Sequence, residues 1–214
     1  MKQPSSFVIA IAGGSGSGKS LLCQALRHQF GPAATAFPFD AYNKDQSHLT
    51  LAERNALNYD IPDAYDIDRY LADLLLLKDG KTIALPTFDY ASHTRCAKTL
   101  SLPSAPIIIT EGFLVLAIPE SHRYFDFTIY VDADGDVRLA RRILRDQKER
   151  GYPPEQVIEQ YLSSVKPMHE KYIEPGKARA DFVFANNGRA GLDPAEMKRL
   201  ITILHKKIAE RENR

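Results

Sequence analysis

The sequence has little of what would place it in several large classes of protein. Its two cysteines, Cys23 and Cys96, form no metal or redox motif, and two cysteines are too few for a disulfide framework. Its 28 lysines and arginines nearly balance 27 aspartates and glutamates, so the basic excess of nucleic-acid-binding proteins is missing. No apolar run approaches the roughly 18 residues of a membrane-spanning helix. These absences predict a cytoplasmic protein that binds neither nucleic acid nor membranes.

The sequence also lacks features that would divide it into separate domains. No repeat or low-complexity linker divides the 214 residues, and no secretory signal precedes the first apolar run. A chain of this length fits one α/β domain with a substantial core. We therefore expect a single domain over residues 1–214, in which Cys23 is a buried packing residue.

What the sequence does contain, near its start, is a complete phosphate-binding motif. Residues 13–20 read GGSGSGKS and fill every fixed position of the pattern G-x-x-x-x-G-K-[ST]. An apolar, β-prone run at 7–12 precedes them, and helix-forming residues at 21–27 follow. In a strand–loop–helix arrangement, backbone N–H groups and a helix N-terminus can hold a polyphosphate. We predict that a nucleoside triphosphate binds to Gly13, Gly14, Ser15, Gly16, Ser17, Gly18, Lys19 and Ser20, with Lys19 at the β- and γ-phosphates and Ser20 on Mg²⁺.

Apolar runs alternate with helical stretches through the rest of the chain. Strands are expected at 34–39, 106–110, 125–131 and 182–185, and helices at 48–55, 67–78 and 137–151, from 154 onward and from 194 onward. This alternation predicts a mostly parallel sheet covered on both faces, the three-layer α/β fold of P-loop NTPases. Residues 81–102 contain short β-prone pieces, which predict an inserted hairpin. Asp193 and Pro194 are a favourable N-cap and first residue for the last helix.

Three of the predicted strands end at an acidic residue. Because ligands of parallel sheets bind beyond the carboxyl ends of the strands, Asp40, Glu111 and Asp132 are candidates for a site. We assign Asp40 as the general base, although an isolated aspartate there could equally cap a helix or stand in a surface turn. Glu111 is placed to hold Mg²⁺ through water, or is an ordinary strand-end acid. Asp134 or Asp136 is expected to cap the next helix.

The predicted helix at 137–151 is dense in arginine. Such a helix can be a solvated face with acidic partners. It can also be a segment that closes over a nucleotide and neutralises charge in the transition state. Because the preceding strand ends at the expected nucleotide site, we favour the second interpretation and predict a lid over residues 141–165.

Several blocks, from the phosphate loop to about Gly188, resemble those of the uridine kinases, within the wider uridine kinase and phosphoribulokinase group of P-loop enzymes. The blocks are residues 40–49, 58–66, 85–95 and 108–112, the arginine-rich helix, and residues 165–175. The resemblance implies transfer of the γ-phosphate of ATP or GTP, with Mg²⁺, to the 5′-hydroxyl of a pyrimidine ribonucleoside. It also implies a homo-oligomer, a tetramer in the family.

The resemblance also implies roles for single residues. Asp40 would deprotonate the 5′-hydroxyl and Asp63 would accept hydrogen bonds from the 2′- and 3′-hydroxyls. His93 would read the edge of the base, with Tyr90 stacked on the base ring, in a hairpin that binds the acceptor. The remaining residues implied are Phe88 and Gln160 at the nucleoside and Arg142, Arg145 and Arg150 at the phosphates and the lid, with Lys19 and Arg145 joining Asp40 in catalysis.

Four residues depart from the family pattern around the acceptor. Asn43 replaces an aromatic residue, Ile61 a histidine, Phe88 a tyrosine and Tyr152 an arginine. These departures keep open a related kinase with another ribonucleoside or a sugar phosphate as acceptor. A regulatory GTPase is an alternative of another class. Residues 43–46 come close to the guanine-reading pattern N-K-x-D, but Gln stands in the last position.

Overall fold

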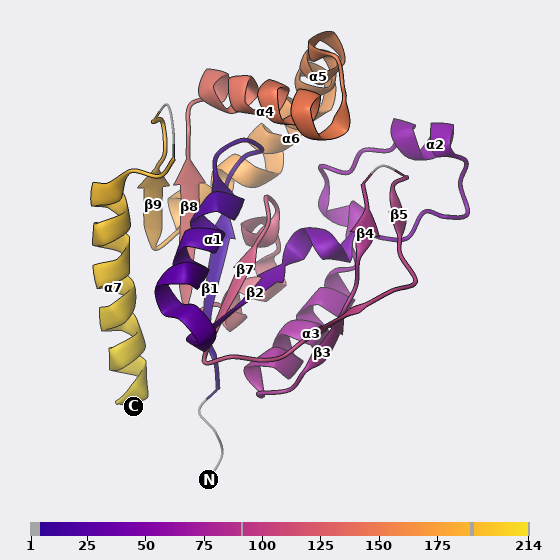
Figure 1. The fold of residues 1–214 in the computed structure, drawn as a ribbon. Helices are drawn as coiled ribbons and strands as arrows, with labels where there is room; N and C mark the ends of the chain where they lie inside the picture. Colours follow the sequence, from indigo (N-terminus) through magenta and orange to yellow (C-terminus); the bar gives the residue numbers. More distant parts are fainter. Residues whose placement is uncertain (1–4, 91, 189–190, 214) are drawn as a thin grey trace.

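Five parallel strands form the centre of the protein in the computed structural model, which describes residues 5–90, 92–188 and 191–213 (Figure 1). The sheet has the order β2-β7-β1-β8-β9, and each neighbouring pair is parallel. Its strands are β1 (Phe7–Ala12), β2 (Ala34–Pro38), β7 (Ile107–Glu111), β8 (Phe127–Asp132) and β9 (Phe182–Ala185). All five lie within two residues of the predicted runs, and their carboxyl ends share one edge of the sheet.

Helices cover both faces of this sheet, as Figure 1 shows. Side chains of β1 alternate between two cores: Ile9 and Ile11 pack with residues of α1 (Lys19–Phe30) and α7 (Pro194–Glu212), among them the buried Cys23. Val8 and Ala10 pack with α3 (Ile67–Lys78) and the segments after β2 and β7. The predicted three-layer α/β fold is therefore confirmed. No helix among the described residues combines the length and the apolar character needed to cross a membrane.

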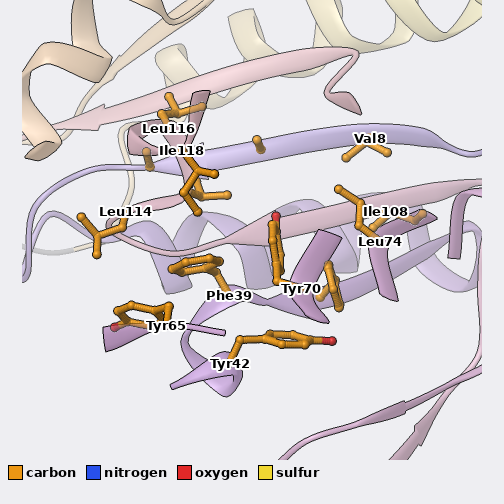
Figure 2. Packing of buried hydrophobic residues seen from close by; sticks show 14 of the residues in the cluster. Val8, Phe39, Tyr42, Tyr65, Tyr70, Leu74, Ile108, Leu114, Leu116 and Ile118 are labelled. Atoms are coloured by element: carbon orange, nitrogen blue, oxygen red, sulfur yellow. The ribbon is translucent and has the colours of Figure 1, made fainter. Parts of the chain in front are cut away.

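An aromatic cluster fixes the chain that follows β2 (Figure 2). Phe39 stacks on Tyr65 with ring centroids 4.6 Å apart and meets Tyr70 edge-on at 4.9 Å. The hydroxyl of Tyr70 lies 2.9 Å from Thr110 Oγ1 on β7. These buried rings hold the short helix η2 (Phe39–Tyr42), and so Asp40, against the end of the sheet.

Residues 83–102 form two antiparallel pairs that project from the sheet. They are β3 (Ile83–Leu85) with β6 (Leu100–Leu102), and β4 (Phe88–Asp89) with β5 (Thr94–Arg95). Helix α2 (Leu51–Ala56) begins after Thr50, where the expected range began at 48, because Thr50 and Glu53 form a capping box. The remaining short helices are η1 (Gly31–Ala33), η3 (Pro62–Ala64), η4 (Val115–Ala117), η5 (Pro119–Tyr124) and η8 (Glu174–Arg179).

The arginine-rich helix is α4 (Gly135–Arg150), and its predicted cap is confirmed in position only. Asp134 occupies the N-cap position and its carbonyl accepts from the N–H of Arg138, but its side chain makes no cap bond, and Asp136 Oδ1 accepts from the adjacent N–H of Val137. Asp134 is instead tied to a distant loop, because its N–H donates to Asn187 Oδ1 at 2.8 Å. In α7 the predicted cap is confirmed, since Asp193 accepts from the N–H groups of the next turn.

A continuous helical stretch follows α4 and contains two π-helical turns. It runs through α5 (Pro154–Gln160), η6 (Tyr161–Val165), α6 (Lys166–Met168) and η7 (His169–Ile173). Pro167 lies within it and has no N–H for a regular helical bond, so a wider turn before it relieves the mismatch. Residues 1–4, 91, 189–190 and 214 belong to the predicted domain, and residue 91 to the block at 85–95, but they lie outside the described residues.

Candidate active site

The phosphate loop leaves the carboxyl end of β1 and leads directly into α1. Gly13, Gly16 and Gly18 have φ of 145°, 79° and 102°, values that side chains rarely tolerate, so these glycines are required by the backbone. Lys19 is buried, and its Nζ donates to the carbonyl of Gly14 at 3.1 Å. Gly18 caps α1 without a side chain, which leaves the first N–H groups of the helix free to meet an anion.

Two acidic residues stand beside this loop, as predicted from the strand ends. The Ser20 hydroxyl donates to Glu111 at 3.3 Å, so a hydroxyl and a carboxylate lie side by side. Oxygen ligands of this kind suit Mg²⁺, which takes few protein ligands and completes its shell with phosphate and water. Asp40 has a buried Oδ1 without a hydrogen-bond partner among the residues that the structure describes. Burial and then the charge of Glu111 raise the pKa of Asp40 to about 7, with Lys19 opposing.

A cavity of about 520 Å³ opens at this edge and joins most of the predicted residues. Its volume is in the range of small-molecule sites. Five separate parts of the chain line it: the phosphate loop with the start of α1, the segment after β2, the β4–β5 hairpin, the end of β7, and the stretch from α4 to η6. The predicted residues in its wall are Ser15, Lys19, Ser20, Asp40, Phe88, Tyr90, His93, Glu111, Arg142, Arg145, Arg150 and Gln160. The loop glycines and Ser17 are not among the residues that line it.

Three arginines of α4 are held by an aspartate that sequence analysis missed. Asp146 is fully buried. Its carboxylate lies 3.5 Å from Arg142 Nε, 2.9 Å from Arg145 Nε and 3.4 Å from Arg150 Nη1. The spacing of four residues from Asp146 to Arg142 and to Arg150 was the signal available in the sequence. The arginines therefore have an acidic partner, as expected for a solvated helix face, but Arg142, Arg145 and Arg150 line the cavity.

Arg142 joins the phosphate loop to the helices beyond α4. Its Nη1 donates to Ser15 Oγ at 2.9 Å, and its Nη2 donates to Gln160 Oε1 at 2.7 Å. Burial lowers the pKa of Arg142, while the charges of Asp146 and Asp60 raise it. One side chain therefore bridges two walls of the cavity.

Aromatic side chains form another part of the cavity wall. His93 stacks on Tyr59 at 4.8 Å and has a φ of 53°, which is rare for a residue with a side chain. Burial lowers the pKa of His93, and the charges of Arg150 and Arg54 add to this. Tyr90 meets Phe88 edge-on, and its hydroxyl donates to the carbonyl of Asp40 at 3.4 Å. The hairpin therefore faces the predicted base.

The structure does not bring Asp63 into the cavity wall, and Asp60 of the same block lies there instead. Asp63 is exposed on η3 and is absent from the cavity wall, because Pro62 starts a turn that carries it outward. Asp60 lines the cavity and accepts a hydrogen bond from Ser164 Oγ at 3.1 Å. Burial raises the pKa of Asp60, and the charge of Arg142 opposes the shift. Both aspartates lie in the block at 58–66, which gave no way to choose between them.

Comparison with known proteins assigns the chain to a family. The sequence model of the Phosphoribulokinase / Uridine kinase family matches residues 8–190. The chain belongs to this family. It is 44% identical over 182 residues to the uridine kinase of Staphylococcus carnosus. The aligned region covers 85% of this chain and 88% of that protein. The chain is therefore a kinase with a nucleotide as phosphate donor, and a regulatory GTPase is not favoured.

Solved structures of the same fold support the assignment of the architecture. The phosphoribulokinase of Rhodobacter spheroides has a TM-score of 0.62 at 18% identity, covering 86% of this chain and 71% of that one. The D-glycerate 3-kinase of Cryptococcus neoformans has a TM-score of 0.63 at 16% identity, covering 86% of each chain. At this identity the likeness concerns the fold alone.

Proposed function

We propose that the protein transfers the γ-phosphate of ATP or GTP to the 5′-hydroxyl of a pyrimidine ribonucleoside, with uridine as the leading acceptor. The observation that carries the proposal is one cavity whose wall joins Lys19 and Ser20 of the phosphate loop to Tyr90 and His93 of the hairpin. Asp40 lies in the same wall. The 44% identity to a protein named uridine kinase supports this acceptor.

In this proposal Asp40 begins the reaction. Its carboxylate takes the proton of the 5′-hydroxyl as the oxygen attacks the γ-phosphorus, and the bond from that phosphorus to the β–γ bridging oxygen breaks. Lys19 and the three arginines held by Asp146 offset the charge that develops on the phosphoryl oxygens. Ser20 and, through water, Glu111 would hold Mg²⁺, which supplies charge neutralisation between the β- and γ-phosphates.

The acceptor is held by other groups in the cavity wall. Asp60 replaces Asp63 as the acceptor of hydrogen bonds from the ribose hydroxyls, because it is the aspartate of this block in the cavity wall. The aromatic rings of Phe88 and Tyr90 suit a flat base, and His93 and Gln160 offer polar groups to its edge.

The proposal includes larger-scale features. The whole chain acts as one kinase domain, in which residues 81–102 form the acceptor-binding hairpin and residues 141–165 the lid. The working form is a cytoplasmic homo-oligomer, a tetramer by family resemblance.

A panel of acceptors tests the proposal. The purified protein is assayed with MgATP or MgGTP against uridine, cytidine, adenosine, guanosine and ribulose 5-phosphate at matched concentration, with a reaction lacking acceptor as background. Uridine and cytidine should give kcat/KM values at least about tenfold above the others, because a site built for one base leaves polar groups unpaired with another. A higher value with a purine nucleoside or the sugar phosphate would overturn the proposed acceptor. Hydrolysis that no acceptor accelerates would contradict the transfer itself.

A further inference from the structure

Gly14 stands at a position that the phosphate-loop pattern leaves open to any residue, yet the structure has no room there for a side chain. A Cβ at this position would lie 2.5 Å from Nη1 of Arg138 and 3.0 Å from its Cζ. Gly14 is not among the glycines with positive φ, so its backbone alone does not demand glycine. The requirement comes from the guanidinium of Arg138, which lies directly against the loop.

Arg138, unlike Arg142, Arg145 and Arg150, has no acidic partner among the described residues. It is 7% exposed. Its Nε donates to the carbonyl of Ala133 at 3.0 Å, while its Nη1 is buried and has no hydrogen-bond partner within the described parts of the chain. Arg141, one turn on, donates to the carbonyls of Gly16, Asn186 and Gly188. A buried cation without a counter-charge is costly, so its presence calls for a reason.

The charged groups around Arg138 do not supply that counter-charge. Burial lowers the pKa of Lys19, and the charges of Arg145 and Arg138 add to this against Glu111 and Asp40. Burial lowers the pKa of His169 as well, again with Arg138 adding to the shift. The nearby Glu174 is engaged elsewhere, since it accepts from Tyr130 at 2.9 Å and lies 3.0 Å from His169 Nε2. Two buried cations, Lys19 and Arg138, therefore meet at the loop.

We propose that Arg138 is a positioning residue for the phosphate donor: it braces the loop backbone at Gly14, and the bound polyphosphate balances its charge. This inference rests on the proposed function, because it requires a nucleoside triphosphate at the loop. Arg138 acts through the loop and is distinct from Arg142, Arg145 and Arg150, which face the cavity.

Calorimetric titration of R138Q, R138K and the control R123Q tests whether Arg138 supports binding of the phosphate donor, and steady-state kinetics give the KM for uridine. R138Q should bind ATP and ADP about tenfold more weakly, since a charge-assisted contribution is lost, while the KM for uridine changes less than about twofold. R138K should recover part of the affinity, because it keeps the charge but not the planar guanidinium. The control is R123Q, because Arg123 is exposed on η5 and lies over Tyr124. Unchanged ATP affinity in R138Q would overturn the inference, and equal losses for ATP and uridine would reduce Arg138 to a general structural role. Wild-type protein that binds no ATP would instead overturn the proposed function.

A double-mutant cycle tests the contact with the loop. G14A should weaken ATP binding by more than about tenfold in the native background, because the methyl group must displace the guanidinium or the loop. In the R138Q background the same change should cost less than about threefold, since the obstacle is gone. Additive losses would contradict the proposed contact. If R138Q does not fold, the cycle is run with R138K, in which the slimmer ammonium should also relieve G14A.

Discussion

At the scale of single residues, the protonation of Asp40 should set the pH dependence of the reaction. Burial and the charge of Glu111 raise its pKa to about 7, and a general base must be unprotonated. We expect kcat/KM to fall about tenfold per pH unit below pH 7 and to level off above it. A pH–rate profile at saturating MgATP measures this. D40N should keep nucleotide binding and show no such acidic limb, and a wild-type profile that is flat between pH 5 and 8 would remove Asp40 as the base.

The same pKa predicts a cost in stability. In the unfolded chain the pKa of this carboxyl is near 3.8, so between there and about 7 the folded protein binds more protons than the unfolded one. Stability therefore falls as the pH rises through this window, and the whole cost is present above pH 7. D40N removes the charge, so its Tm should exceed that of the wild type at pH 8. The difference should shrink toward pH 4; an equal difference at both pH values would show that the charge is not the cause.

Asp60 and Asp63 offer a matched pair for testing the acceptor site. D60N removes the charge of a carboxylate in the cavity wall, and we expect the KM for uridine to rise about tenfold or more, as for a lost charged hydrogen bond. D63N makes the same chemical change three residues away on an exposed turn, where the KM should change less than about twofold. Steady-state kinetics at fixed MgATP distinguish the two. A larger effect at Asp63 would restore the assignment made from the sequence.

At the scale of elements, Asp146 holds three arginines of α4 together through one shared carboxylate. Replacing this buried carboxylate with an amide leaves three guanidinium groups without their shared counter-charge. We expect D146N to lower kcat about tenfold or more, because the three guanidinium groups are no longer held in position beside the phosphoryl group. We also expect a lower Tm, because the buried charges lose their partner. D136N is the control on the same helix, because Asp136 is exposed and accepts only from Val137. Normal kcat in D146N would show that the arginines need no such anchor.

The elements also show how far the sequence could be read. Continuous apolar runs predicted all five strands of the sheet, and Asp193 predicted the start of α7, because these signals are local. The turn at Pro62 carries Asp63 outward, but the hydrogen bond that Asp60 accepts in the cavity wall comes from Ser164, which is 104 residues away. Asp134 stands at the N-cap of α4 as predicted, but its N–H is bonded to the distant Asn187 and its side chain makes no cap bond. Where the partner is distant in the chain, the local pattern lacks the information.

At the scale of the whole molecule, a nearly neutral chain concentrates its functional charge in one place. The formal net charge is +1, yet Lys19 and the five arginines of α4 converge on the cavity or the loop beside it. A triphosphate would neutralise this concentration, and the segments that carry it would then draw together. Arg142 is central to such a closure, because it already joins Ser15 in the loop to Gln160 at the end of α5.

Hydrogen exchange can test whether residues 141–165 close as a lid. MgADP alone should slow exchange in the phosphate loop and α4, and uridine alone should slow it around 57–60 and 88–95, since each ligand orders its own wall. With both bound, residues 150–165 should be protected by more than the sum of the single effects, because only then do both ligands fill the cavity. Amides of α7 serve as the internal control, because α7 packs on β9 away from the cavity wall. If the protection of 150–165 with both ligands equals the sum of the two single effects, this stretch is a fixed wall. The exclusion of water during transfer would then have to come from the hairpin.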